Sequence, residues 1–268
     1  MLLELLKYIV DEYPFEAFIR LLIFFSIAGG LYYLLHTVFK NYFSKLKIQK
    51  KDFQDKKVWH DIKWSFLNRL VLSLITVIIG FFVLKNYSLL YTDINNFSFT
   101  LFSINFSGWF YFFFSIILVL LIHETYFYFL HRLMHHRFVM QKVHKLHHNS
   151  TDPTSFTGYA FHPLETVIEF GFLPLIIFLL PLHINAFLIW QMVILLFTIY
   201  VHVGYEIMPK FWVNNFFTKY INTPTHHSMH HSKFNYNFGL YFNFWDRMFG
   251  TQHEKYEEVF LEIKNRQS

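Results

Sequence analysis

Residues 109–136 read WFYFFFSIILVLLIHETYFYFLHRLMHH, an apolar run that ends in a cluster of histidines. Such a run can cross the hydrocarbon core of a bilayer as a single helix, which needs about 20 residues. The composition favours the same interpretation, because 54% of the 268 residues are hydrophobic and only 15% are charged, whereas a soluble domain carries about 25% charged residues. We therefore expect an integral membrane protein and exclude disordered and collagen-like chains.

Five apolar segments follow one another along the chain, at about residues 17–39, 68–84, 109–130, 167–180 and 184–201. The first three can each span a membrane, whereas the last two are short and closely spaced. We predict an all-α integral membrane protein with three transmembrane helices plus a short helical hairpin that tilts in or re-enters the bilayer. Residues 1–14 lack the basic start and the cleavage site of a signal peptide, so we expect them in the mature protein.

Basic residues gather in three segments between the apolar runs. Residues 40–63 contain eight Lys, residues 131–165 contain four Lys or Arg, and residues 202–268 contain seven, which together are 19 of the 23 basic residues. By the positive-inside rule these segments and the C-terminus face the cytosol. The net charge of +5 then indicates anionic lipid headgroups and no nucleic acid as partner. We divide the chain into residues 1–64, an N-terminal transmembrane helix with a basic cytosolic loop, and residues 65–268, which contain the other apolar segments.

Histidines are the unexpected feature of this apolar chain. Fourteen of the 17 lie between His123 and His231, and most of them form three boxes, at 131–136, 144–148 and 226–231. Positions i, i+3 and i+4 of a helix share a face, so we expect each box to present its imidazoles together on a cytosolic helical cap. His202 is a plausible ninth partner. The predicted metal ligands are His131, His135, His144, His147, His148, His202, His227, His230 and His231.

That number of imidazoles exceeds what one metal ion takes, since a structural zinc has four ligands and a catalytic zinc has three plus water. The boxes therefore predict two ions, although imidazole alone does not choose among Fe, Zn, Cu and Ni. Within the doubled pair, His226 points about 100° away from His227 on a helix, so we expect His226 beside the site or as an alternate ligand. Pro224 favours a helix that starts there. His162 and Glu206 are further candidates for such a role.

Histidine-rich sequences also occur in other classes of metal-binding protein. His123 and Glu124 begin the H-E-x-x-H pattern of zinc proteases, but Phe127 occupies its final position, which excludes that class. The absence of cysteine excludes disulfides, thiolate metal sites and a cysteine nucleophile. A histidine-rich metal transporter and a non-catalytic metal-binding membrane protein stay open as alternatives, although transport needs ligands near the bilayer midplane and the boxes lie outside the apolar segments.

The boxes resemble those of the fatty acid hydroxylase/sterol desaturase superfamily of membrane-bound di-iron oxygenases, whose hallmark motifs are H-x(3)-H, H-x-x-H-H and H-x-x-H-H. The resemblance covers about residues 65–252 and implies that residues 65–268 form a catalytic domain of this type. Phe238 stands where the family often has Tyr. The closing segment is most similar to the sterol C5-desaturase and alkylglycerol monooxygenase branches. Segments that carry the resemblance besides the boxes are Tyr128–Arg132, Pro153–Phe156, Ala160–Glu165, Asn235–Gly239 and Phe244–Gly250.

The resemblance implies an O2-dependent di-iron oxidoreductase that hydroxylates or desaturates a membrane lipid, such as a sterol or a fatty acyl chain. It implies two iron ions as cofactors and O2 as co-substrate. Because the chain shows no nucleotide-binding glycine motif and no cysteine cluster, its electrons must come from a separate cytochrome b5, ferredoxin or flavoprotein. Glu165, Glu206 and Asp246 are candidates to orient the histidine rings by hydrogen bonds.

Overall fold

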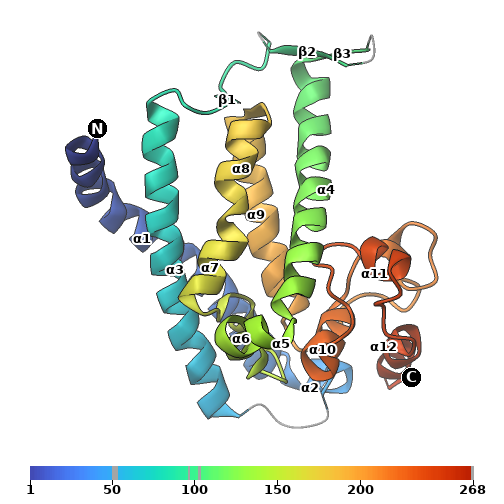
Figure 1. Ribbon diagram of the computed structural model, residues 1–268. Helices are drawn as coiled ribbons and strands as arrows, with labels where there is room; N and C mark the ends of the chain where they lie inside the picture. Colours follow the sequence, from blue (N-terminus) through green and yellow to red (C-terminus); the bar gives the residue numbers. More distant parts are fainter. Residues whose placement is uncertain (50–53, 96, 102–103, 267–268) are drawn as a thin grey trace.

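Four long helices form the frame of the protein, α1 (Leu2–Tyr33), α3 (Asp55–Leu84), α4 (Gly108–Met134) and α9 (Ile184–Val201) (Figure 1). The computed structural model describes residues 1–49, 54–95, 97–101 and 104–266. Among these residues, four helical segments are long and apolar enough to cross a membrane: Leu2–Val38, Asp55–Leu84, Gly108–Met134 and Ile184–Val201. Part of the predicted basic loop, residues 50–53, lies outside the described residues.

The count of three transmembrane helices plus a short hairpin therefore needs correction. α9 has 18 residues, which at 1.5 Å per residue is about 27 Å, close to the hydrocarbon thickness of a bilayer. The preceding apolar segment is divided at Gly171 into α7 (Pro163–Phe170) and α8 (Phe172–Leu179). α8 runs to the end of the bundle opposite the histidine boxes, and α9 returns from there (Figure 1). The helix α9 is therefore long enough to span a membrane by itself, whereas α8 has only eight residues.

The protein is mostly helical, as predicted, and two small strand pairs that were not predicted lie at that opposite end. β1 (Leu90–Tyr91) pairs in parallel with β4 (Leu182–His183), which joins the α3–α4 connection to the α8–α9 turn. β2 (Ser98–Leu101) and β3 (Ile104–Ser107) form an antiparallel hairpin that leads into α4. These strands satisfy backbone groups of the connecting chain that no helix can satisfy.

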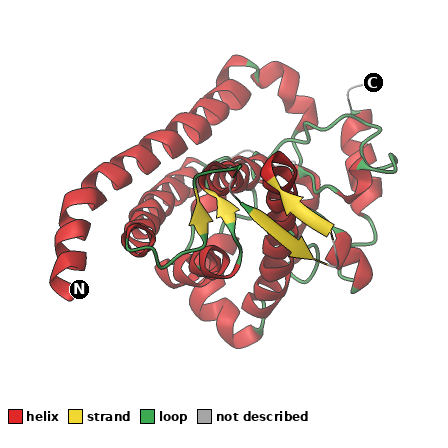
Figure 2. Cartoon of the chain, turned by 90° about the horizontal axis from the view of Figure 1, so that it is seen from above, coloured by secondary structure: helices red, strands yellow, loops and turns green. Residues whose placement is uncertain are grey.

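α1 begins much earlier than the apolar pattern indicated, because residues 1–14 are helical too and Pro14 lies inside the helix. The polar residues of its first turns are exposed and favour a helix at least as well as a loop. Figure 2 shows α1 running along the outer edge of the other helices. α3 is continuous across residues 64 and 65, so the two regions into which the sequence was divided share a helix.

Two apolar clusters hold the bundle together. One joins α3, α4, α8 and α9 through residues such as Leu72, Val119 and Trp190. The other packs Phe24 and Ala28 of α1 against Tyr159 and its neighbours. Between membrane-spanning helices such packing stabilises the fold through van der Waals contacts, because lipid tails are as apolar as these side chains.

Short helices at one end of the bundle form a cap that carries the histidine boxes (Figure 1). Thr223 caps α10 by accepting a hydrogen bond from the His226 N–H, and Pro224 occupies its first turn, which confirms the predicted helix start. The short helical elements are η1 (Leu34–Val38), α2 (Lys40–Phe43), η2 (Ser44–Leu46), α5 (Arg137–Val139), η3 (Met140–His144), α6 (Lys145–His148), η4 (Thr157–Tyr159), η5 (Thr218–Tyr220), α10 (Pro224–Lys233), α11 (Phe244–Met248) and α12 (Tyr256–Asn265).

Candidate metal centre

The structure brings the nine predicted histidines together in two adjoining groups. Within each group, ring nitrogens that could bind a metal lie within 4.8 Å of one another. Eight of the nine side chains are buried, and His135 is half-buried. The first group is His131, His135, His144, His148 and His230, and the second is His147, His202, His227 and His231.

The expectation that each box presents all its imidazoles together is wrong for the second and third boxes. His144 and His148 belong to the first group, whereas His147 belongs to the second. The third box is divided in the same way. His230 belongs to the first group, whereas His227 and His231, which are four residues apart, belong to the second. A helix turns by about 100° per residue, so positions i and i+4 nearly coincide while i+3 and i+4 diverge. Each H-x-x-H-H box therefore serves both groups.

Nε2 atoms converge within each group. In the first group, His144 Nε2 lies 3.1 Å from His131 Nε2 and 3.0 Å from His148 Nε2, and His230 Nε2 lies 3.0 Å from His148 Nε2. In the second group, His202 Nε2 lies 2.9 Å from His227 Nε2 and 3.4 Å from His147 Nε2. The rings thus aim the same type of nitrogen at a common centre in each group.

The opposite ring nitrogen of several histidines donates a hydrogen bond to an oxygen. His131 Nδ1 donates to the Phe238 carbonyl at 2.8 Å, and His230 Nδ1 to the Tyr236 carbonyl at 2.8 Å. In the second group, His202 Nδ1 donates to the Thr198 carbonyl at 2.7 Å. A carbonyl oxygen only accepts, so Nδ1 must carry the proton and Nε2 must present its lone pair inward. Metal-bound histidines show this arrangement.

The donor set fits two bound cations. Burial lowers the pKa of His148 to about 3 and that of His202 to about 4, so both imidazoles are neutral at physiological pH. Among the described residues, several buried nitrogens have no hydrogen-bond partner, including His135 Nε2 and both ring nitrogens of His231. Such groups are costly to bury unless something binds them, and a metal ion at each centre would bind one nitrogen of each ring.

The acidic residues predicted to orient the rings behave differently from one another. Glu165 is buried and its Oε1 accepts a hydrogen bond from His144 Nδ1, as expected. Glu206 instead accepts the backbone N–H groups of Met208 and Thr225, so it caps the start of α10. His162 lies outside both groups and its Nδ1 accepts the Leu164 N–H at the start of α7.

Asp246 acts on the backbone and contacts no histidine of either group. Its two oxygens accept the N–H groups of Phe238 and Gly239 at 2.8 and 2.9 Å. Glu124 extends this support, because it accepts the N–H of Tyr241 at 2.7 Å. Gly239 is required here, since a Cβ at this position would lie 2.8 Å from Glu124 Oε1 and collide with the chain. The two carboxylates therefore fix the segment whose Phe238 carbonyl holds His131.

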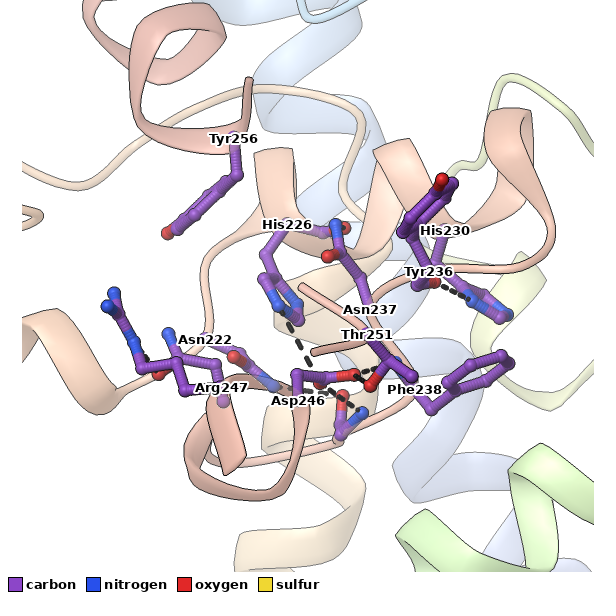
Figure 3. Close-up of polar contacts among 12 residues, drawn as sticks. Asn222, His226, His230, Tyr236, Asn237, Phe238, Asp246, Arg247, Thr251 and Tyr256 are labelled. Carbon is purple, nitrogen blue, oxygen red and sulfur yellow. Dashed lines mark hydrogen bonds and ion pairs between the residues drawn. The ribbon is translucent and has the colours of Figure 1, made fainter. Parts of the chain in front are cut away.

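His226 lies outside both groups, as the helical pattern predicted. Figure 3 shows its ring directed toward Asp246, with Tyr256 nearby and His230 on the other side bound to Tyr236. His226 Nε2 is 3.8 Å from Asp246 Oδ2, and its ring centroid is 5.0 Å from that of Tyr256. Burial lowers its pKa to about 3.

A small cavity of about 30 Å³ opens beside the histidines. Its walls combine histidines of both groups with apolar and aromatic side chains, including Phe127, Phe161 and Leu240. Ligand sites have this character, with apolar walls and a few polar groups that fix orientation. The histidines of both groups therefore adjoin an apolar surface inside the protein.

Comparison with known proteins agrees with this geometry. Residues 116–251 match the fatty acid hydroxylase family. The chain is 30% identical to lathosterol oxidase of Homo sapiens over 239 residues, which are 88% of this chain and 76% of that protein. It is 36% identical to methylsterol monooxygenase 1 of Rattus norvegicus over 153 residues, or 56% of this chain and 51% of the relative. No solved structure matches the chain.

A fungal relative extends the same similarity. A Delta(7)-sterol 5(6)-desaturase of Gibberella zeae is 27% identical over 207 residues, which cover 77% of this chain and 59% of that protein. The chain therefore belongs to the fatty acid hydroxylase family, and it is a membrane-bound lipid oxidoreductase. The superfamily that the histidine boxes indicated is confirmed.

Sequence reasoning missed the oxygen partners of the rings. The carbonyls of Phe238, Tyr236 and Thr198 are backbone atoms, so no residue type reveals them. In the sequence, Glu124 belongs to an incomplete zinc-protease pattern, which does not indicate its partners. Its support of residues 240–242 comes from a distant part of the chain that only the fold brings near.

Proposed function

We propose that the protein is an O2-dependent di-iron enzyme that hydroxylates or desaturates a membrane lipid. The observation that carries the proposal is the pair of histidine groups at the end of an apolar cavity, each group aiming converging ring nitrogens at one centre. The five-histidine and four-histidine groups would each hold one iron ion. The sterol enzymes among its relatives support a lipid substrate. The alternative of a transporter is disfavoured because the groups lie in the terminal cap.

The residues of the chain prepare such a site before any substrate arrives. Carbonyl and carboxylate acceptors hold the rings in one tautomer, so the nitrogens are already placed to bind metal. When bound, two irons would supply the binding and reduction of O2 needed to oxidise an unactivated C–H bond. The apolar lining of the cavity would bind the alkyl part of the lipid and exclude water from the reacting position.

A separate protein would supply electrons, because oxidation with O2 requires reducing equivalents and the chain carries no redox motif besides the histidine groups. The elements that carry the second and third boxes, together with α5 before them, expose the basic side chains of Arg137, Lys142, Lys145 and Lys233. An acidic face on a cytochrome b5, ferredoxin or flavoprotein would complement this surface and speed its docking.

The cap and the C-terminus are proposed to face the cytosol. Support comes from the basic segments, because the start of α3, the box-bearing helices and the C-terminus all lie at one end of the bundle (Figure 1). The absence of native cysteine allows a direct test. Tyr87 is 63% exposed at the opposite end, and Lys145 is exposed on the cap.

We expect a membrane-impermeant maleimide to label Tyr87→Cys in intact cells and to label Lys145→Cys only after the membrane is opened. The unsubstituted chain, which has no thiol, is the background control. The reverse labelling pattern would overturn the orientation and place the cap out of reach of a cytosolic electron donor.

Lipid mass spectrometry tests the activity itself. Cells that express the chain should accumulate a lipid that has gained one oxygen atom or lost two hydrogen atoms, relative to cells without it. The matched control is His231→Ala, which removes a buried member of the second group. A product that appears equally with the variant would show that another enzyme makes it, and absence of any such product would contradict the proposed reaction.

A further inference from the structure

A second hollow lies beside the first, between α1, α3, α8 and α9. It has a volume of about 380 Å³, and most of its lining side chains are apolar. It lies along helices that are long and apolar enough to span a membrane. Its apolar wall includes Ile19, Ile23, Leu72, Leu173, Leu188 and Leu195. We name this hollow the α1–α3–α9 groove.

Arg69 is a buried charged residue among the apolar side chains of the groove. Its side chain lines the groove although the residue is only 3% exposed. The guanidinium carbon lies 3.5 Å from the ring centroid of Tyr159 and 4.7 Å from that of Phe24. Its Nε and Nη2 atoms have no hydrogen-bond partner among the described residues. A buried charge without a paired acceptor is costly, and inside a membrane it marks a functional position.

The other charged residues of the groove do not neutralise Arg69. Arg20 and Glu16 also line it, but Glu16 accepts a hydrogen bond from Arg20 Nε and the two form an ion pair with each other. Arg20 Nη2 additionally donates to Gln191 Oε1 at 3.4 Å. The groove walls therefore carry two guanidinium groups and one carboxylate, which leaves one positive charge unbalanced.

The groove adjoins the cavity at the histidines. Tyr159, Phe170 and Ile194 line both hollows, so a single layer of side chains separates them. The aromatic ring that covers the Arg69 guanidinium is one of these three. A lipid bound at Arg69 would therefore lie beside the cavity that the histidines line.

We propose that the α1–α3–α9 groove binds an acidic lipid whose carboxylate or phosphate pairs with Arg69. Nε and Nη2 lie on one edge of the guanidinium, and that edge matches two oxygens of a carboxylate or phosphate. A hydroxyl group offers one acceptor and no charge, so it leaves the excess charge uncompensated. The identity of this lipid as the substrate rests on the proposed function; its binding does not.

Binding to purified metal-free protein tests the proposal without any turnover. The probes are oleate, oleoyl lysophosphatidate, oleyl alcohol and lathosterol, of which only the first two are anionic. We expect the unsubstituted protein to bind oleate or lysophosphatidate at least tenfold more tightly than oleyl alcohol. The anion that binds more tightly identifies carboxylate or phosphate as the preferred group. Arg69→Met should abolish the preference, whereas Lys85→Met, which removes an exposed cation from the end of the same helix, should keep it.

Equal binding of all four probes by the unsubstituted protein, or a preference that survives Arg69→Met, would overturn the proposal. If Arg69→Met does not fold, labelling of the unsubstituted protein with a photoreactive oleate tests the proposed lipid site instead. It should label α1 and α9 peptides, and excess oleate but not oleyl alcohol should prevent the labelling. Labelling elsewhere contradicts the assignment. Arg69-dependent binding, combined with no lipid oxidation by the iron-loaded protein, would instead contradict the proposed function alone.

Discussion

Replacing His147 by alanine is expected to lower the iron content from about two ions to about one per chain and to abolish lipid oxidation. His147 belongs to the four-histidine group, so its loss leaves three imidazoles there and the five-histidine group intact. The fall in activity should exceed the 10- to 100-fold that loss of an outer hydrogen-bond partner typically causes. Metal analysis and product formation by the same purified sample would measure both effects.

His136→Ala is the matched control for that substitution. His136 adjoins the first box but is exposed and belongs to neither histidine group. It should therefore retain both iron and activity. Full activity in His147→Ala would contradict the assignment of His147 as a ligand, and equal losses in the two variants would show that the effect is not specific to the groups.

His227→Ala should lose iron and activity, whereas His226→Ala should retain both. His227 Nε2 lies 2.9 Å from His202 Nε2 within the second group, whereas His226 faces Asp246 and Tyr256. Because His226 is fully buried, its truncation should still destabilise the fold by about 0.5–3 kcal/mol. Iron content, turnover and thermal unfolding of the two variants separate these effects.

A larger iron loss in His226→Ala than in His227→Ala would move the ligand assignment by one residue. It would also mean that α10 does not begin at Pro224 as a regular helix. The comparison is internally controlled, since the two histidines are adjacent, chemically identical and both buried.

The sequence predicted which histidines come together better than it predicted how they divide. Eight of the nine were found because their spacing follows the helical period. Their assignment to two groups was missed, because treating i, i+3 and i+4 as one face ignores the divergence between His147 and His148. His202 was found from its place after an apolar segment, and the structure puts it directly after α9.

Features that depend on distant contacts escaped prediction. The rings of His131 and His230 are held by backbone carbonyls, which carry no residue identity. Arg69 stood at the edge of an apolar segment, and only the packing of α1 against α3 reveals its burial. The hydropathy pattern also predicted too short a first helix, because the polar residues of exposed helical turns give no apolar signal.

The metal content of the purified protein tests the central claim most directly. Protein purified without oxygen and supplied with iron should contain about two iron ions per chain after exhaustive removal of free metal. The nine converging imidazoles predict this value, and His136→Ala should match it. One ion per chain, or none, would contradict the two-metal centre that the histidine groups indicate.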